Sequence, residues 1–439
     1  MKENGRSICG GKALVLDLHA IVAGLSGCPC GRRHEVAIRD VRIGRGLVAQ
    51  AGVILAQNDF PKNILLVADE NTLRASDGIL PALENTGYRA KLRLYKNLRV
   101  AEMENVDAIA AQLADFEAVL SVGSGSLNDV CRLAAKKADV PFAIFATAPS
   151  MDGFASCTAP ITVNHFKRSY PARQPDVIIA DTDILAAAPG ELKAAGFGDV
   201  IGKFTALADW RLSHLFTGEY LCDRVVSLTR DAAQSVADMA DSIQKNDPDA
   251  AQKLMEALVI TGIAMTFAGC TRPASGAEHI VSHFWEIQKL ARGEISDYHG
   301  KKVGIATDIV NRIYHELAAS EDISPAAKPL DWDGIEAAFG PNFIEQVRRD
   351  NTPPLEDALD LARLKALWPR ARQIIFEELP DVETLRKWMR AANAPIDPAS
   401  ADVDDELARR GVRWAAYMRD RFTLLRIMPL LSMESAMKP

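Results

Sequence analysis

The feature that most constrains the fold is a change of pattern near residue 186. Before it, short apolar runs rich in β-branched and aromatic residues alternate with helical patterns. These runs predict five strands, at 63–69, 88–95, 117–122, 141–147 and 176–180. Strands that alternate with helices are typical of right-handed βαβ units, so a parallel sheet is expected here.

Beyond residue 186 the apolar residues follow helical spacing and no strand is predicted. We therefore expect an α/β nucleotide-binding domain over 1–186 and an all-helical domain over 187–439. The length of 439 residues is enough for two such domains with cores of their own. An active site is expected in the cleft between them, because ligand sites often form between domains. Near the N-terminus, 14–25 is predicted to form a short helix.

Composition excludes several classes of protein. There are 51 basic and 58 acidic residues, a net charge of −7, which argues against a nucleic-acid partner. Hydrophobic residues make up 48% of the chain, which rules out a mostly disordered protein. The longest apolar stretch, 258–270, is shorter than the roughly 18 residues that span a membrane. It is predicted to be a buried helix, and no membrane partner is expected.

The cysteines favour a reducing compartment. Their number, seven, is odd and they are spread thinly, so a cytoplasmic protein without a disulfide framework is expected. The segment 25–28 resembles a lipoprotein cleavage box, but charged residues interrupt the stretch before it. Cys28, Cys30 and His34 could hold a soft metal ion. Since two thiols and one imidazole leave a tetrahedral site one ligand short, a surface turn with free thiols is the favoured interpretation.

A glycine-rich loop, 123–129, follows the predicted strand 117–122 and precedes a helical pattern. Glycines there would let the backbone approach a phosphate at a helix N-terminus, although a strand-to-helix turn needs small residues in any case. A second loop, 147–153, ends the next strand, where open α/β sheets bind ligands. Asp69 ends another strand, and it could accept hydrogen bonds from a ribose or cap the following helix.

Three of the eight histidines lie within 21 residues of one another. His279 and His283 are four apart in a helical pattern and share a face, and His299 follows. A catalytic divalent metal site usually has three protein ligands and one open position. Asp199 is the candidate carboxylate ligand, but an aspartate that opens a helix can equally be its N-cap. Spacing alone leaves metal ligation and a structural role open.

Five motifs, in order, resemble a known family. They are GSGSLND, TAPSMDGFAS, GFGDVIGKFTALADW, EHIVSH and HGKKVG, and they lie within 42–307. The chain resembles the AraM-like bacterial branch of glycerol-1-phosphate dehydrogenases. That family shares the fold of iron-containing alcohol dehydrogenases and dehydroquinate synthase. The resemblance implies an α/β domain with a parallel sheet that binds NAD(P), and a helical domain that binds metal and substrate.

The resemblance also implies roles for particular residues. Asp199, His279 and His299 correspond to the metal ligands. Asp152, Asp199 and His283 correspond to substrate contacts, and Asp199 and His283 are the catalytic candidates. The nucleotide site would comprise Asp69, Gly123, Ser124, Gly125, Ser126, Leu127, Thr147, Ala148, Pro149, Ser150 and Ser156.

The implied reaction is hydride transfer between sn-glycerol 1-phosphate and dihydroxyacetone phosphate, with NAD or NADP and one divalent metal ion, zinc, nickel or iron. The alternatives are a glycerol or polyol dehydrogenase, a lyase of the dehydroquinate synthase type, and a catalytically silent NAD sensor. The expected partner is a small phosphorylated substrate, and a homodimer is compatible with the resemblance. Lys203, Lys301 or Lys302 could meet the phosphate, but each is interpreted as a solvated lysine.

Overall fold

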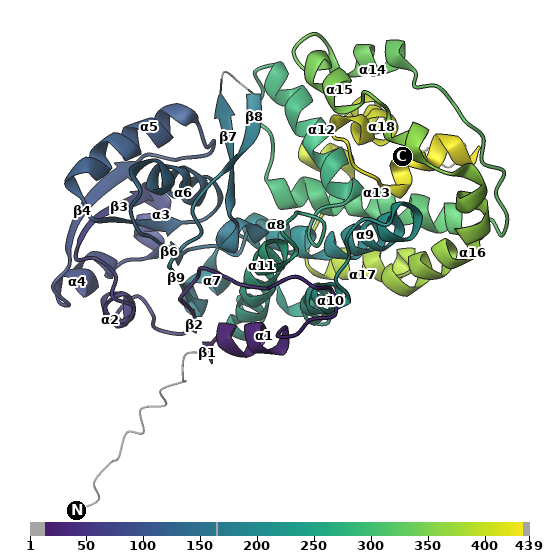
Figure 1. Ribbon diagram of the computed structural model, residues 1–439. Helices are drawn as coiled ribbons and strands as arrows, with labels where there is room; N and C mark the ends of the chain where they lie inside the picture. Colours follow the sequence, from purple (N-terminus) through teal and green to yellow (C-terminus); the bar gives the residue numbers. More distant parts are fainter. Residues whose placement is uncertain (1–13, 164–165, 433–439) are drawn as a thin grey trace, which may run out of the picture.

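The computed structural model describes residues 14–163 and 166–432. Figure 1 shows an α/β region, in purple and blue, beside a helical region, in green and yellow. The strands are β1 (Leu14–Val15), β2 (Asp40–Gly44), β3 (Asn63–Asp69), β4 (Arg89–Tyr95), β5 (Ala118–Gly123), β6 (Phe142–Ala146), β7 (Thr158–Val163), β8 (Phe166–Pro171) and β9 (Val177–Asp181).

The helices fall into two sets along the chain. Those before residue 190 are α1 (Leu18–Gly24), α2 (Ala51–Gln57), α3 (Glu70–Ala75), α4 (Ile79–Glu84), α5 (Met103–Gln112), α6 (Gly125–Ala138) and α7 (Thr182–Ala187). The later helices are α8 (Gly190–Ile201), α9 (Lys203–Thr217), α10 (Asp223–Ala237), α11 (Pro248–Ala268), α12 (Ala277–Ala291), α13 (His299–Ala319), α14 (Trp332–Phe339), α15 (Ile344–Asp350), α16 (Leu361–Glu378), α17 (Val382–Ala391), α18 (Asp405–Trp414) and α19 (Leu424–Ile427).

The predicted parallel sheet is confirmed. Its strand order is β1-β2-β9-β6-β5-β3-β4, and all neighbours are parallel except β1 and β2. Each of the five predicted strands is present, with its ends within one residue of those expected. Four further described strands were not predicted: the sheet strands β1 and β2 and the two strands of the separate antiparallel hairpin β7–β8.

The helix predicted over 14–25 is shorter than expected. Leu14 and Val15 belong instead to β1, which pairs with β2 at the edge of the sheet. The helix α1 begins at Leu18. Asp17 caps it, because its carboxylate accepts a hydrogen bond from the backbone N–H of Ala20 at 2.8 Å. The N-cap therefore fixes a boundary that the apolar pattern alone placed too early.

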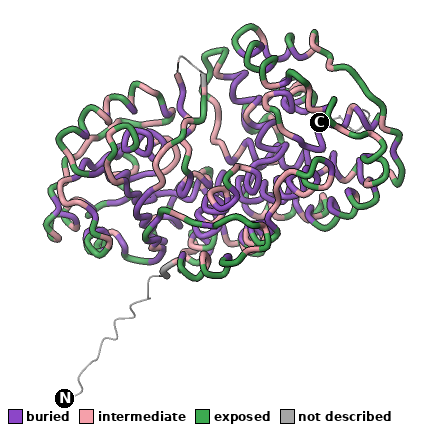
Figure 2. The backbone as a smooth tube through the Cα atoms, in the orientation of Figure 1, coloured by how far each residue is buried: buried purple, intermediate pink, exposed green. Residues whose placement is uncertain are grey.

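Both faces of the sheet are covered, which explains why its central strands are apolar throughout. In β3, Ile64 and Leu66 belong to a core that includes α2 and α4. Leu65 and Val67 point to the other face and belong to the core that includes α5 and α6. That second core continues without a break into the helical region, as the buried segments in the middle of Figure 2 show.

Glycines allow α8 and α13 to cross in close contact. A Cβ atom on Gly198 would lie 2.5 Å from the carbonyl oxygen of Gly300, and one on Gly300 would lie 2.0 Å from that of Ala195. Both distances are too short for any side chain, so the two helices can approach this closely only with glycine at these positions. The crossing brings Asp199 on α8 next to His299, the first residue of α13.

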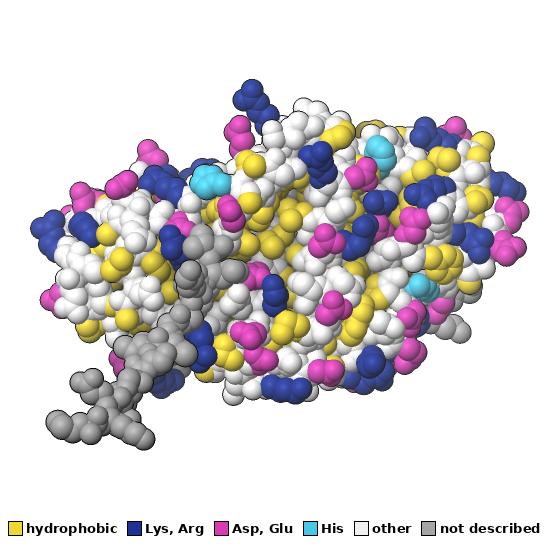
Figure 3. Space-filling view, turned by 90° about the horizontal axis from the view of Figure 1, so that it is seen from below, with side chains coloured by type: hydrophobic (Ala, Val, Ile, Leu, Met, Phe, Trp, Pro, Cys, Tyr) yellow, Lys and Arg dark blue, Asp and Glu magenta, His cyan; other side chains and the backbone are white. Residues whose placement is uncertain are grey.

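One described helix, α11, is long and apolar enough to cross a membrane, but 72% of its most apolar window is buried inside the protein. That burial is typical of a core helix, as the sequence predicted for 258–270. On the face shown in Figure 3, basic and acidic side chains are interspersed rather than gathered into one basic patch.

Candidate active site

A cavity of about 1150 Å³ lies between the sheet and the helical region. Its lining includes residues from the carboxyl ends of β3 and β6, from the start of α6, and from α12 and α13. Of the residues predicted to form the site, these line it: Asp69, Ser124, Gly125, Ser126, Leu127, Thr147, Ala148, Ser150, Asp152, Ser156, His279, His283 and His299. Gly123 and Pro149 are not part of the lining, and Asp199 lies fully buried behind it.

The two loops predicted to bind the nucleotide lie next to each other. They follow the neighbouring strands β5 and β6, and the N–H of Thr147 donates to the carbonyl oxygen of Gly123 at 3.2 Å. Gly125 opens α6 with a φ of +26°, and no atom lies within 4 Å of a Cβ built on it. The backbone at this helix N-terminus therefore leaves space that a phosphate group of a dinucleotide can fill.

Asp69 both caps a helix and lines the cavity. Its Oδ1 accepts hydrogen bonds from the backbone N–H groups of Asn71 and Thr72, each at 2.9 Å, so it caps α3. The same residue lines the cavity at the end of β3. The helix cap is therefore present in the structure, and contact with a ribose stays a prediction.

Asp199, His279 and His299 come together although 100 residues separate the first from the last. One ligand atom from each lies within 4.8 Å of the others, and Nε2 of His279 is 3.5 Å from Oδ1 of Asp199. Around a tetrahedral ion with bonds of about 2.0–2.1 Å, two such ligand atoms lie roughly 3.3 Å apart. The donor set and its spacing therefore fit a divalent metal ion.

A buried carboxylate orients the first histidine. Nδ1–H of His279 donates to Oε1 of Glu278 at 2.7 Å, which leaves Nε2 free to bind a metal. Glu278 is itself held by the N–H of Gly276 and the hydroxyl of Thr205, each at 2.7 Å. Glu278 was not among the predicted site residues, because a sequence pattern does not show which way a side chain points.

The electrostatic environment differs between the histidines. Burial lowers the pKa of His299 to about 3 and holds that of His283 well below its ordinary value, so both are neutral. Burial also opposes charge on His279, but its hydrogen bonds to Asp199 and Glu278 outweigh that effect and raise its pKa. Neutral imidazoles are the form that binds metal ions.

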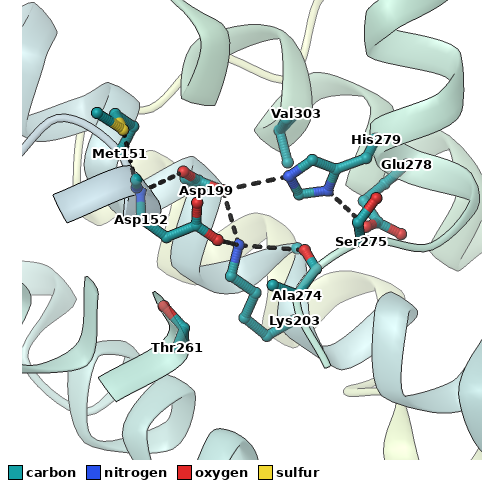
Figure 4. Close-up of polar contacts among 12 residues, drawn as sticks. Met151, Asp152, Asp199, Lys203, Thr261, Ala274, Ser275, Glu278, His279 and Val303 are labelled. Atoms are coloured by element: carbon teal, nitrogen blue, oxygen red, sulfur yellow. Dashed lines mark hydrogen bonds and ion pairs between the residues drawn. The ribbon is translucent and has the colours of Figure 1, made fainter. Parts of the chain in front are cut away.

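The interpretation of Lys203 as a solvated lysine is wrong. Its side chain is fully buried, and Nζ lies 2.7 Å from both Oδ1 of Asp199 and Oδ2 of Asp152 (Figure 4). Burial raises the pKa of Asp199, but Lys203 and the nearby histidines bring it well below the ordinary value. Asp199 is therefore ionised, as a metal ligand must be, and Lys203 offsets part of the buried negative charge.

The other two lysines also have partners. Lys302 is fully buried, and its Nζ lies 2.6 Å from the hydroxyl of Ser296, so its interpretation as solvated is wrong as well. Lys301 is largely buried and pairs with Asp297 at 2.5 Å.

A second set of possible ligands shares His299. It consists of His283, Glu286 and His299. Glu286 lies 2.9 Å from Lys167 and 3.5 Å from Lys302, so the two lysines outweigh its charge and disfavour a cation. Around the first set, the negative charge exceeds the positive charge, because three carboxylates (Asp152, Asp199 and Glu278) face one ammonium group (Lys203). Electrostatics therefore favour the first set as the metal site.

Comparison with known proteins identifies the family. Residues 42–189 match the model of the iron-containing alcohol dehydrogenase family. The chain is 31% identical over 409 residues to the glycerol-1-phosphate dehydrogenase [NAD(P)+] of Bacillus licheniformis, a match that covers 92% of each protein. The chain belongs to the glycerol-1-phosphate dehydrogenase family. The enzyme of that name from Geobacillus stearothermophilus is 32% identical over 93% of this chain and 96% of its own.

These relatives confirm the predicted enzyme class, an oxidoreductase that uses NAD(P) and a divalent metal ion. Solved structures confirm the fold. A probable glycerol dehydrogenase from Sinorhizobium meliloti matches with a TM-score of 0.60 at 15% identity, covering 91% of this chain and 94% of that one. An NADH-dependent butanol dehydrogenase from Thermotoga maritima also gives 0.60, at 14% identity, covering 92% and 96%. The roles of the individual site residues in this chain remain predictions.

Proposed function

We propose that this protein interconverts sn-glycerol 1-phosphate and dihydroxyacetone phosphate, with NAD(H) or NADP(H) as hydride carrier. The observation that carries the proposal is the similarity over more than nine tenths of the chain to relatives named glycerol-1-phosphate dehydrogenase [NAD(P)+]. The cavity supports it, because one space adjoins a helix N-terminus suited to a dinucleotide and a cluster of metal-binding side chains.

The cofactor and the metal would supply the redox chemistry and the Lewis acid. Asp199, His279 and His299 would hold a zinc, nickel or iron ion, which would supply a Lewis acid for the reacting oxygen, and the bound nicotinamide would supply the hydride chemistry. The start of α6, from Gly125 to Leu127, would hold the pyrophosphate. Asp69 and the loop after β6 would hold the remainder of the nucleotide.

His283 and Asp152 would act on the substrate hydroxyls. Within the described residues, His283 makes ring contacts with His279 and His299 but no hydrogen bond, so its ring nitrogens are available to a ligand. Its free ring nitrogens would let it hydrogen-bond a substrate hydroxyl and pass the hydroxyl proton during oxidation and reduction. Asp152, whose carboxylate is fixed by Lys203, would orient a hydroxyl.

Arg419 is the best candidate for the phosphate contact. It lines the cavity from the segment after the 3₁₀ helix η6 (Ala415–Met418), and its charge helps to lower the pKa of His283. Among the described residues its guanidinium forms no hydrogen bond or ion pair, whereas other basic side chains of the lining have partners: Arg74, Arg99 and Lys167. A guanidinium free to donate can bind a phosphate with two hydrogen bonds.

The proposal is tested with purified protein reconstituted with zinc, nickel or iron. Dihydroxyacetone phosphate should drive the oxidation of NADH or NADPH, and sn-glycerol 1-phosphate should drive net formation of the reduced nucleotide. A lyase of the dehydroquinate synthase type would restore its NAD in every turnover, and a sensor would show no turnover. If neither substrate changes the nucleotide absorbance with any of the three metals, the proposed reaction is wrong.

Several further properties belong to the same proposal. The odd number of cysteines and the mixed surface charge support a cytoplasmic enzyme whose partner is a small phosphorylated substrate rather than nucleic acid or a membrane. We place the boundary between the nucleotide-binding and metal-binding domains after Ala186, because every described strand precedes it. A homodimer stays a prediction, which light scattering of the purified protein would test.

A further inference from the structure

Four side chains from two segments distant in the sequence meet outside the lining of the cavity. Cys28, Cys30 and His34 lie in the irregular segment between α1 and β2, and Cys222 immediately precedes α10. One ligand atom from each lies within 4.8 Å of the other three. The sequence of the first segment offers three of the four ligands that a tetrahedral site needs, and the fold brings the fourth from almost 200 residues away.

Three of the six distances between the four ligand atoms are close to the edges of a tetrahedron, and all six are within 4.8 Å. Sγ of Cys28 and Sγ of Cys222 are 3.5 Å apart. Nε2 of His34 is 3.2 Å from Sγ of Cys30 and 3.7 Å from Sγ of Cys222. For zinc bonds of about 2.3 Å to sulfur and 2.0–2.1 Å to nitrogen, the edges are roughly 3.8 Å between sulfurs and 3.6 Å between sulfur and nitrogen. The side chains are therefore already arranged around a space of the right size.

Neighbouring groups orient these side chains as metal ligands. Nδ1 of His34 lies 3.0 Å from the carbonyl oxygen of Phe267, so it carries the proton and Nε2 faces the sulfurs. The hydroxyl of Tyr220 donates to Sγ of Cys30 at 3.3 Å. Cys222 is the N-cap of the 15-residue helix α10. Burial raises the pKa of its thiol, so its proton would be displaced when a metal ion binds.

The surroundings also offset the charge of the cluster. Three thiolates, a neutral imidazole and a divalent ion carry a net charge of about −1. Arg32 lies between the ligands Cys30 and His34 in the chain, with its guanidinium stacked on the ring of Tyr220 at 3.4 Å and donating to the carbonyl oxygen of Ala268. Its positive charge is thus fixed beside the tyrosine that contacts Cys30.

We propose that Cys28, Cys30, His34 and Cys222 bind a structural zinc ion. Three sulfurs and one nitrogen in a tetrahedron suit zinc best among the common divalent ions. All four positions are taken by protein side chains, which is typical of a structural rather than a catalytic site. The interpretation of this segment as a surface turn with free thiols is therefore replaced.

The position of the proposed zinc site in the fold indicates what the zinc ion would stabilise. The segment from 25 to 39 contains no helix or strand. It follows α1, passes α10 and α11, and leads to β2 of the sheet (Figure 1). The zinc ion would fasten this segment to the start of α10, while His34 and Arg32 contact the end of α11. It would therefore join the segment that leads to β2 of the nucleotide-binding sheet to α10 and α11 of the helical region.

The test uses the full-length His279→Ala variant, which lacks one ligand of the candidate active site. After expression with zinc and extensive dialysis, it should retain about one zinc ion per chain. X-ray absorption should show a zinc environment dominated by sulfur at about 2.3 Å. The active-site candidates include no sulfur ligand, so sulfur scattering reports the cysteine cluster even if zinc also remains at the active site, whatever reaction the enzyme catalyses.

Two further variants make the assignment specific. Adding Cys222→Ser to His279→Ala should remove the sulfur-bound zinc, and adding Cys270→Ser, a half-buried cysteine outside the cluster, should leave it. Absence of zinc–sulfur scattering in the His279→Ala protein would overturn the proposal without any need for a cluster variant. So would a thiol titration of the unfolded protein that is two thiols short until reductant is added, because Cys28 and Cys222 would then form a disulfide.

Discussion

Lys203 is the residue on which the buried charges of the candidate active site depend. It lies between Asp152 and Asp199, and removing its charge would leave two carboxylates facing each other away from water. We predict that Lys203→Met lowers the free energy of unfolding of the metal-free protein by about 3–5 kcal/mol, as measured by urea denaturation.

The matched control is Lys137→Met. Lys137 forms an ion pair with Asp107 at 2.5 Å, but both side chains are exposed. Surface pairs contribute little, so the change should be below about 1 kcal/mol. A Lys203→Met protein as stable as this control would show that the two carboxylates are not held ionised by the lysine.

Replacing either histidine of α12 should have a different effect on the metal content. His279→Ala removes a proposed ligand that Glu278 orients, so both bound metal at the active site and turnover should fall at least tenfold. His283→Ala should lower turnover while the metal content stays near that of the wild type. Elemental analysis of the purified variants decides this. Equal depletion in both would make His283 a ligand, as its proximity to Glu286 and His299 would allow.

Much of the site's residue chemistry was predictable from residue type and spacing. His279 and His283 share a helix face, and Asp199 offered a carboxylate, so a metal site was a reasonable expectation. The surroundings were not predictable. In the sequence Lys203 cannot be told from a surface lysine of a helix, and only the structure shows that it is buried against Asp152, Asp199 and the carbonyl oxygen of Ala274.

At the scale of elements, the turn between β5 and α6 is predicted to hold the pyrophosphate. Gly125→Val would place a branched side chain in the space beside the helix N-terminus, at a φ of +26° that side chains avoid. NADH affinity should fall at least tenfold in a fluorescence titration, while circular dichroism shows an intact fold. Unchanged affinity would remove this turn from the nucleotide site.

The close crossing of α8 and α13 should not tolerate a larger side chain. Gly198→Ala adds a Cβ at 2.5 Å from a backbone oxygen, and backbone cannot move aside cheaply. We expect a loss of about 1–3 kcal/mol in the free energy of unfolding, together with weaker metal binding, since Asp199 follows directly. Gly24→Ala, where no atom lies within 4 Å, is the control and should change neither quantity. A Gly198→Ala protein that matches this control would contradict the close crossing.

Some strands could be predicted from the sequence and others could not. β5 and β6 are buried on both faces, so they appear as unbroken apolar runs and were predicted to within a residue. β2 was missed because its five residues include Asp40 and Arg42, whose charges are paired with each other at 2.8 Å. The ion pair is a tertiary feature that an apolar pattern does not contain.

At the scale of the whole molecule, the cavity needs the last third of the chain, for which the sequence offered no motif. Arg419 directly follows η6, and the packing of η6 against α12 brings Arg419 to the cavity. The phosphate contact therefore depends on contacts between residues more than 100 positions apart, which spacing could not reveal. Arg419→Met should raise the KM for dihydroxyacetone phosphate and leave that for dihydroxyacetone nearly unchanged.

The proposed enzyme reduces a phosphorylated ketone, so its kcat/KM for dihydroxyacetone phosphate should exceed that for dihydroxyacetone. Each charge-assisted contact to a phosphate contributes about 1.5–3 kcal/mol, and two such contacts predict roughly a hundred-fold or greater preference for dihydroxyacetone phosphate over dihydroxyacetone. The metal-reconstituted enzyme should show this preference in the NADH or NADPH oxidation assay. Equal values for the two ketones would contradict the account, and a polyol dehydrogenase would then be the better description.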